Sequence, residues 1–360
     1  MKHKVKKEMK RIAMIGGTLG LLICNITTMT GCKFINTKKI YDKENASTGS
    51  SITKEVFAMD TYMTLTAYGD RAEEAVSKAV EEIQRIELLV STGLKDSEIA
   101  AINQNGSAQV SEDTLFLIEK SLELYESTEG AFDISIYPVM EEWGFTTGDY
   151  QLPEKGRLLE LLKNVDASKI AINGSVVALE EGMKIDLGGI AKGYTSARIM
   201  EIFKEYGVEQ AIVSLGGNVQ TLGAKQEKEG WKVAVENPND TSDYLGVLEI
   251  ADKAVITSGG YKRYFEEDGK HYHHIIEPAT GYPAKSGLIS VTIISEDGTL
   301  ADGLSTSLFV MGKEKAVAYW KENTELFDFV LEEEDGSIYV SEGAAQQFSS
   351  NYEVTIITKQ

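Results

Sequence analysis

The chain has 360 residues, enough for one large domain or two. Hydrophobic residues make up 42% and charged residues 26%, which is close to globular averages and excludes disorder for most of the chain. The formal net charge is −20, and residues 1–31 hold six bases and one acid, so the remainder carries about −25. Such an acidic body repels nucleic acid and anionic membrane surfaces, which argues against nucleic-acid binding.

Residues 1–31 have the pattern of a targeting segment. A basic stretch, KHKVKKEMKR, precedes an apolar run at 12–26 that is short for a membrane-spanning helix but suits a signal peptide. The sequence MTGC that ends at Cys32 resembles a bacterial lipoprotein signal, with Met29 where Leu is usual. We therefore expect a lipidated Cys32, palmitate included, on the extracytoplasmic side of the cell membrane. An ordinary secretory signal or an uncleaved anchor is the alternative.

The two cysteines leave no disulfide in a processed chain, because Cys24 lies in the segment that would be removed. Residues 32–54 are polar and rich in Lys, Asn, Ser and Thr, which is typical of a flexible tether. A single folded domain is expected over 55–360, since no linker interrupts it.

The first half of this domain is mainly helical by pattern. A strand-like run covers 56–69, and Asp70 is expected to cap a helix with an apolar face through Val90. A second helix is expected from Ser111 to about Ser127. Because of Pro138, the sequence favours an extended or mixed segment at 131–140. A weaker helix and three short strands follow, at 154–163, 169–172, 175–179 and 183–187.

Strands dominate the second half. A strand, a glycine turn and a helix occupy 183–207, and further strands are expected at 211–215, 231–237, 245–250 and 254–258. Two helices at about 299–310 and 313–322 precede closing strands near 326–331, 337–340 and 352–357. The segregation of helices and strands favours an α+β fold with largely antiparallel sheets and helices packed on them.

Two glycine turns could approach a ligand closely. DLGGIAKG at 186–193 lies between a strand and a helix, where backbone groups can contact a phosphate or a metal, but its spacing matches neither common nucleotide motif. A tight structural connection is the equal alternative. For Gly216-Gly217-Asn218 a simple turn is favoured over a phosphate contact.

Polar chemistry is densest between His271 and Gly312. His271 and His273 share one face of a strand and His274 the other, and a single histidine suits proton transfer near neutral pH. Zinc is not expected, because further ligands are missing. Asp302 and Thr306 are one helical turn apart, and this oxygen pair suits Mg2+, although each also has an ordinary structural explanation.

Taken together, these segments resemble the ApbE-type FAD:protein FMN transferase family. The matching segments keep the family's order along the chain: MDT (59–61), AFD (131–133), IDLGGIAKGY (185–194), SLGGN (214–218), ITSGGYKRYF (256–265), HHIIEPATGYP (273–283) and ADGLSTSLFVMG (301–312). The resemblance implies Mg-dependent transfer of FMN from FAD to a Thr or Ser of an extracytoplasmic redox protein through a phosphoester, with release of AMP.

The resemblance also implies roles for particular residues. The metal would be held by the Gly189 carbonyl and the side chains of Asp302 and Thr306, and His274 would remove the proton. Contacts with FAD, the substrate, would come from Met59, Ala131, Phe132, Asp133, Asp186, Lys192, Ile276 and Ser305.

The chain departs from the family pattern at three positions. Asp60 stands where Gly is frequent, Glu277 where Asp is frequent, and Gly93 where a flavin-contacting Tyr often follows Ser-Thr. These departures bear on flavin binding. Two rival functions stay open: an FAD pyrophosphatase that gives FMN and AMP, and a flavin-binding lipoprotein without chemistry.

Overall fold

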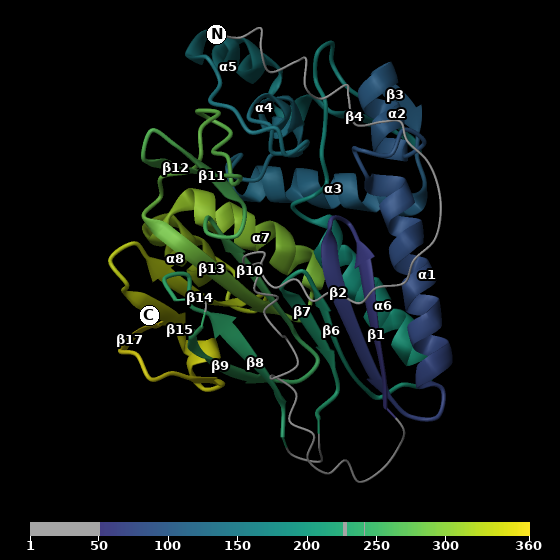
Figure 1. Ribbon diagram of the computed structural model, residues 1–360, viewed down its shortest axis with the longest axis vertical. Coiled ribbons are helices and arrows are strands. Elements are labelled where there is room, and N and C mark those ends of the chain that lie inside the picture. Colours follow the sequence, from purple (N-terminus) through teal and green to yellow (C-terminus); the bar gives the residue numbers. More distant parts are fainter. Residues whose placement is uncertain (1–50, 226–228, 241) are drawn as a thin grey trace, which may run out of the picture. The chain divides into compact units, whose positions relative to one another are not determined.

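A nine-stranded sheet forms the centre of the fold (Figure 1). The computed structural model describes residues 51–225, 229–240 and 242–360, which belong to one compact unit. The strand order is β1-β2-β6-β7-β10-β13-β14-β15-β17, and each neighbouring pair is antiparallel except β15–β17. The strands are β1 (Ser51–Ala58), β2 (Thr61–Tyr68), β6 (Gln210–Leu215), β7 (Asn218–Leu222), β10 (Ala254–Gly259), β13 (Leu288–Ser295), β14 (Asp328–Glu333), β15 (Ile338–Ser341) and β17 (Val354–Ile357).

Three smaller sheets surround it. They have the orders β16-β9-β8, β3-β5-β4 and β11-β12. Their strands are β3 (Ser107–Gln109), β4 (Ala171–Asn173), β5 (Val176–Ala178), β8 (Trp231–Glu236), β9 (Tyr244–Ile250), β11 (Tyr264–Glu267), β12 (Lys270–His273) and β16 (Phe348–Ser349). The expected α+β class with largely antiparallel sheets is confirmed.

The helices are most numerous in the first half of the described chain. They are α1 (Ala72–Val90), α2 (Glu98–Asn105), α3 (Glu112–Ser127), α4 (Tyr137–Glu142), α5 (Lys155–Leu161), α6 (Ala191–Glu205), α7 (Gly298–Met311), α8 (Lys313–Glu322) and α9 (Glu342–Ala345), with 3-10 turns η3 (Ile134–Ile136), η4 (Leu162–Asn164) and η5 (Ala167–Lys169). Among the helices of these residues, none has the length and apolar character needed to cross a membrane.

The two faces of the large sheet are covered differently. Alternation along β10 sends Ile256 toward the cluster that contains α7 and Val255 toward the cluster formed with β8 and β9. Helices α1 and α6 cover β2 and β6 through a third cluster, which includes Ile83 and Phe203. The helical face of the sheet therefore carries the N-termini of α6 and α7, where the candidate site lies.

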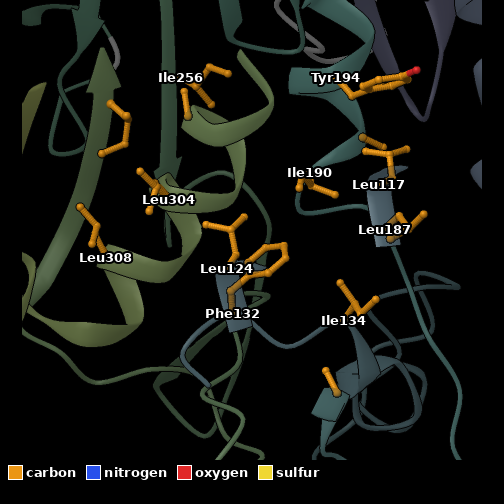
Figure 2. Close-up of a cluster of buried hydrophobic side chains, with 14 of the residues drawn as sticks. Leu117, Leu124, Phe132, Ile134, Leu187, Ile190, Tyr194, Ile256, Leu304 and Leu308 are labelled. Atoms are coloured by element: carbon orange, nitrogen blue, oxygen red, sulfur yellow. The ribbon is translucent and has the colours of Figure 1, made fainter. Parts of the chain in front are cut away.

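Helices α6 and α7 pack closely because both have a glycine at the contact. A methyl group on Gly193 would lie 2.1 Å from the carbonyl oxygen of Gly298 and 2.6 Å from Asp302 Cβ. Figure 2 shows the adjoining apolar cluster, to which α7 contributes Leu304 and Leu308 and the turn before α6 contributes Ile190. The same contact thus fixes α7 and its polar residues against the start of α6.

The expected boundary of the tether is wrong by four residues. Strand β1 begins at Ser51, so residues 51–54 pair with β2 in the folded body. The expected run at 56–69 is two strands, because Met59 and Asp60 form the hairpin turn with φ values of 49° and 58°. The expected signal segment 1–31 and Cys32 lie outside the described residues.

Three local predictions also need correction. Helix α1 has Arg71 at its N-cap, with no side-chain cap, and Asp70 does not serve. Residues 134–142 are helical, since Pro138 lies in the first turn of α4, where its missing N–H costs nothing. Residues 183–187 form no strand and have no regular secondary structure. The helix expected after Ser111 is confirmed, with Ser111 as its N-cap.

The α6–α7 contact gives a test of the fold. Gly193→Ala should lower the free energy of unfolding by about 1–3 kcal/mol, because the backbones of α6 and α7 must separate to admit the methyl group. Gly156→Ala in α5 is the matched control, since no heavy atom lies within 4 Å of its added Cβ. Chemical denaturation measures both, and equal stability of the two variants would contradict the close packing.

Candidate active site

Two hairpin turns and the starts of two helices meet at one end of the large sheet. The Met59 sulfur accepts a hydrogen bond from Thr195 Oγ1 of α6 at 3.8 Å, and the Met59 N–H donates to Glu87 of α1 at 2.7 Å. The β6–β7 turn lies against the β1–β2 hairpin, since a Cβ on Gly216 would be 2.5 Å from Thr61 Oγ1. Asn218 then connects this turn to α7. Segments far apart in sequence therefore enclose one small region.

Asp302 is the central buried carboxylate of this region. Its Oδ2 accepts a hydrogen bond from the Gly193 N–H at 2.8 Å, and its Oδ1 accepts one from Asn218 Nδ2 at 3.0 Å. Burial raises the pKa of Asp302, while the charge of Lys192 and these hydrogen bonds lower it. Within the described residues it forms no salt bridge, so a bound cation would relieve its desolvation.

The Gly189 carbonyl lies one turn before this contact. In a regular helix the Gly193 N–H would bond to that carbonyl, but here it donates to Asp302 instead. The Gly189 oxygen is thus released from its helical donor at the start of α6. A Cβ on Gly189 would lie 3.1 Å from the Phe132 ring, so the turn also runs close to the AFD loop.

Thr306 and Ser305 follow Asp302 on α7. Ser258 of β10 lies between their hydroxyls, with Ser258 Oγ 2.8 Å from Ser305 Oγ and 3.3 Å from Thr306 Oγ1. Ser305 is fully buried and also donates to the Asp302 carbonyl at 2.8 Å. Thr306 is only partly buried, so its hydroxyl has the greater freedom to bind a ligand.

His274 lies just after β12 and has a defined tautomer. Its backbone N–H and its Nδ1 both lie 3.1 Å from the carbonyl oxygen of Arg263. A carbonyl can only accept, so Nδ1 carries the proton and Nε2 keeps a free lone pair. Burial, followed by the charge of Arg263, lowers the pKa of His274 to about 3. The imidazole is therefore neutral at physiological pH.

The other two histidines hold the fold. His273 Nε2 lies 3.1 Å from the Ala284 carbonyl, and burial lowers the pKa of His273 to about 4. His271 Nε2 lies 3.1 Å from the Gly260 carbonyl, and its ring stacks on Tyr264 with centroids 4.0 Å apart. Their rings are on the same side of β12, as the strand alternation predicted.

Asp186 and Lys192 belong to the turn that precedes α6. Asp186 Oδ1 accepts the Gly188 N–H at 2.9 Å, and Lys192 Nζ donates to the Gly188 carbonyl at 3.3 Å. Burial raises the pKa of Asp186, whereas the nearby charges of Lys192 and Arg263 lower it. The charge of Lys192 also acts on Asp302 and His274, so this cation is shared among the three groups.

The AFD loop is held by its own hydrogen bonds. Phe132 N–H donates to Thr128 Oγ1 at 3.2 Å. Asp133 is buried, and its Oδ1 accepts from the N–H and hydroxyl of Ser135 at 2.8 and 2.6 Å. Its Oδ2 accepts the Ala167 N–H at 3.3 Å. Asp133 thus stabilises the loop, and the half-buried Ala131 is left beside it.

Ile276 is buried in an aromatic cluster next to His274. This cluster includes Trp143 and Phe145, and the Phe145 ring centroid lies 6.4 Å from that of His274. Ile276 also pairs with Pro283 in an isolated bridge, which closes the turn through EPATGY. The cluster therefore gives His274 an apolar wall.

Three residues to which the sequence analysis assigned no side-chain or carbonyl contact belong to the site. Asn218 orients Asp302, Ser258 links β10 to the hydroxyls of α7, and the Arg263 carbonyl orients His274. Asn218 and Arg263 lie within the motifs SLGGN and ITSGGYKRYF, but their partners are 84 and 11 residues away. Only the fold shows which atoms they contact.

The site differs from common metal centres and cavities. In the described part of the chain, no group of three His, Cys, Asp or Glu side chains could hold a metal. One carboxylate, one hydroxyl and one carbonyl do not form such a group, but all are oxygen donors of the kind that Mg2+ takes. An open groove of about 810 Å³ along β8, β9 and β16 contains none of these residues.

Comparisons with known proteins show the family of the chain. The sequence model of the ApbE family matches residues 59–330. The FAD:protein FMN transferase of Treponema pallidum is 31% identical, covering 84% of this chain and 88% of its own length. That of Klebsiella pneumoniae is 30% identical, covering 88% of this chain and 97% of its own length.

Solved structures show the same fold. The crystal structure of the ApbE protein from Thermotoga maritima has a TM-score of 0.78 and 34% identity, covering 83% of this chain and 99% of its own. The flavin transferase ApbE from Vibrio cholerae has a TM-score of 0.74 and 25% identity, covering 83% of this chain and 100% of its own. The chain belongs to the ApbE family.

Proposed function

We propose that the protein is an FAD:protein FMN transferase, which moves FMN from FAD to a Thr or Ser hydroxyl of a partner protein and releases AMP. Its membership of the ApbE family and its relatives of that name support the transferase activity. The observation that carries the mechanism is the buried Asp302, held by Gly193 and Asn218 at the start of α6.

The residues around Asp302 fit a magnesium ion. Asp302 supplies a carboxylate without a salt bridge in the described structure, Thr306 a partly buried hydroxyl, and Gly189 a carbonyl released from its helical donor. Bound there, Mg2+ would withdraw charge from the pyrophosphate and stabilise AMP as the leaving group. Its binding would also offset the desolvation that raises the pKa of Asp302.

His274 is the proton acceptor in this mechanism. The acceptor hydroxyl oxygen attacks the phosphorus on the FMN side of FAD, and its proton moves to His274 Nε2. The bond from that phosphorus to the bridging oxygen breaks, and AMP leaves with the oxygen. The hydrogen bond from Nδ1 to the Arg263 carbonyl fixes the orientation of the ring, so that Nε2 is the nitrogen that accepts the proton. General base catalysis of this kind is typically worth roughly 10²–10⁴-fold in rate.

The remaining residues of the site position the substrate. Lys192 supplies positive charge that acts on Asp186, Asp302 and His274. The turns at 188–189 and 216–217 would admit close backbone contact with the phosphates. The proposed contacts for FAD remain Met59, Ala131, Phe132, Asp133, Asp186, Ile276 and Ser305. Asp133 and Ser305 would contact FAD through their backbone atoms, because their side chains form hydrogen bonds within the protein.

The reaction is proposed to take place outside the cytoplasm. The lipoprotein-type signal that ends at Cys32 supports a lipid anchor on the extracytoplasmic side of the cell membrane. A polar segment after Cys32 would let the domain reach redox proteins at the membrane surface. These are proteins that carry an acceptor Thr or Ser.

Mass spectrometry of an acceptor protein tests the proposal directly. An acceptor with a competent threonine is incubated with FAD, Mg2+ and the enzyme, and the mass of one FMN should be added. Formation of FMN and AMP in the absence of acceptor, without any adduct in its presence, would support an FAD pyrophosphatase instead. Binding of FAD without either product would leave only the flavin-binding lipoprotein.

Removal of the carboxylate at position 302 tests the metal site. Asp302→Ala should abolish transfer, and chelation of divalent ions should abolish it in the wild type until Mg2+ is restored. Mg2+ affinity, measured by calorimetry, should fall in the same variant. Asp297→Ala is the control, because Asp297 only caps α7 through the N–H groups of Thr299 and Leu300. Metal-independent activity in Asp302→Ala would refute the assignment.

Replacement of single histidines tests the base. His274→Gln should lower the turnover number by roughly 10²–10⁴-fold while FAD still binds. His271→Gln should stay close to wild type, because His271 is exposed and its ring lies against the Gly260 carbonyl and Tyr264. Stopped-flow transfer and flavin fluorescence give the two readouts. Equal activity of the two variants would remove His274 from the mechanism.

A further inference from the structure

Arg263 occupies an unusual place beside the candidate base. The segment that joins β10 to β11 includes Tyr261, Lys262 and Arg263. The Arg263 carbonyl takes both hydrogen bonds from His274, so the backbone from which its side chain departs is fixed to the base. The side chain is exposed to solvent, and its charge acts on both His274 and Asp186.

This cation has no carboxylate partner in the described structure. Arg263 takes part in none of the salt bridges found there, although the chain is strongly acidic. Its neighbour Lys262 is paired with Glu236, with Nζ and Oε2 3.4 Å apart. The exposed guanidinium thus remains available for an external anion, on the residue whose carbonyl holds His274.

The positive charge of Arg263 lowers the pKa of His274 and so makes it a weaker base. The cations that act on His274 are Arg263 and Lys192 on α6, and each lowers the pKa of His274; His273 on β12 adds to this only when it is itself protonated. Phe145 contributes only an apolar ring. A phosphate bound by the guanidinium would neutralise this cation and raise the basicity of His274 when substrate is present.

We propose that the Arg263 guanidinium binds a phosphate of the FAD pyrophosphate beside His274, which makes Arg263 a catalytic residue. This inference rests on the proposed transferase function. A guanidinium matches a phosphate with two parallel N–H donors, and such charge-assisted bonds are the strong ones. A lysine at this position would supply the same charge without the two parallel N–H donors.

Three variants separate this role from a general effect of charge. Arg263→Gln should lower kcat/KM for FAD by about 10–100-fold and weaken FAD binding, as loss of a hydrogen bond between charged groups does. Arg263→Lys should recover part of that loss. Lys262→Gln removes the same charge one residue away and should change kcat/KM by no more than about twofold, as for an exposed ion pair. Flavin fluorescence gives FAD affinity, and thermal melting verifies folding.

The pH profile supplies a readout that a structural role would not move. The base must be neutral to act, so activity is lost as the pH falls through the pKa of His274. Because Arg263 holds that pKa down, Arg263→Gln should raise it and move the acid limb of kcat/KM to higher pH. Lys262→Gln should leave the limb in place.

The outcomes are decisive in both directions. Equal kcat/KM, FAD affinity and acid limb in Arg263→Gln and Lys262→Gln would overturn the proposal. An effect confined to KM for the acceptor protein would assign Arg263 to acceptor docking and would also overturn it. Absence of transfer by the wild type would be a failure of the proposed function, whereas the comparison of FAD affinities would still decide whether Arg263 binds the nucleotide.

Discussion

The hydrogen bond from the Gly193 N–H to Asp302 is the interaction on which the site depends. It forms because neither Gly193 nor Gly298 has a side chain, so α6 and α7 approach until a backbone N–H reaches a carboxylate. It sets the position of Asp302, and it takes from the Gly189 carbonyl the donor that a regular helix would supply. One close packing contact therefore prepares a carboxylate and a carbonyl oxygen at the same place.

Electrostatics explain how an acidic chain can serve an anionic substrate. The net charge of −20 is spread over the body, whereas Lys192 and Arg263 act locally on Asp186, Asp302 and His274. Local charge dominates because interactions between exposed groups are screened beyond about 10 Å at ordinary ionic strength. An acidic surface is thus compatible with a cationic site, provided that the site's own acids are bonded or bind a metal.

Much of the fold and part of the site could be predicted from the sequence, for physical reasons. Strand alternation and the Ser111 cap are local signals, and they were right about α3 and most strands. The prediction of an extended or mixed segment was wrong at 134–142. Proline usually ends a helix, but Pro138 lies in the first turn of α4, where proline is favoured. The contacts of Asn218, Ser258 and Arg263 could not be predicted, because they join segments that are separate in the sequence. The departure at Asp60 is accommodated at a φ of 58°, a conformation in which Asp is tolerated and Gly is preferred.

The tautomer of His274 is set by the backbone of its own hairpin. The same Arg263 carbonyl accepts the backbone N–H and Nδ1–H of His274, so the hairpin ladder that joins β11 and β12 also sets the ring. A free-standing histidine would exchange tautomers and rotate, and part of its population would present a proton instead of a lone pair. Here the backbone removes that ambiguity, and the apolar wall of Phe145 and Ile276 keeps the imidazole neutral. The proposed base is therefore neutral and oriented by hydrogen bonding and burial before any substrate arrives.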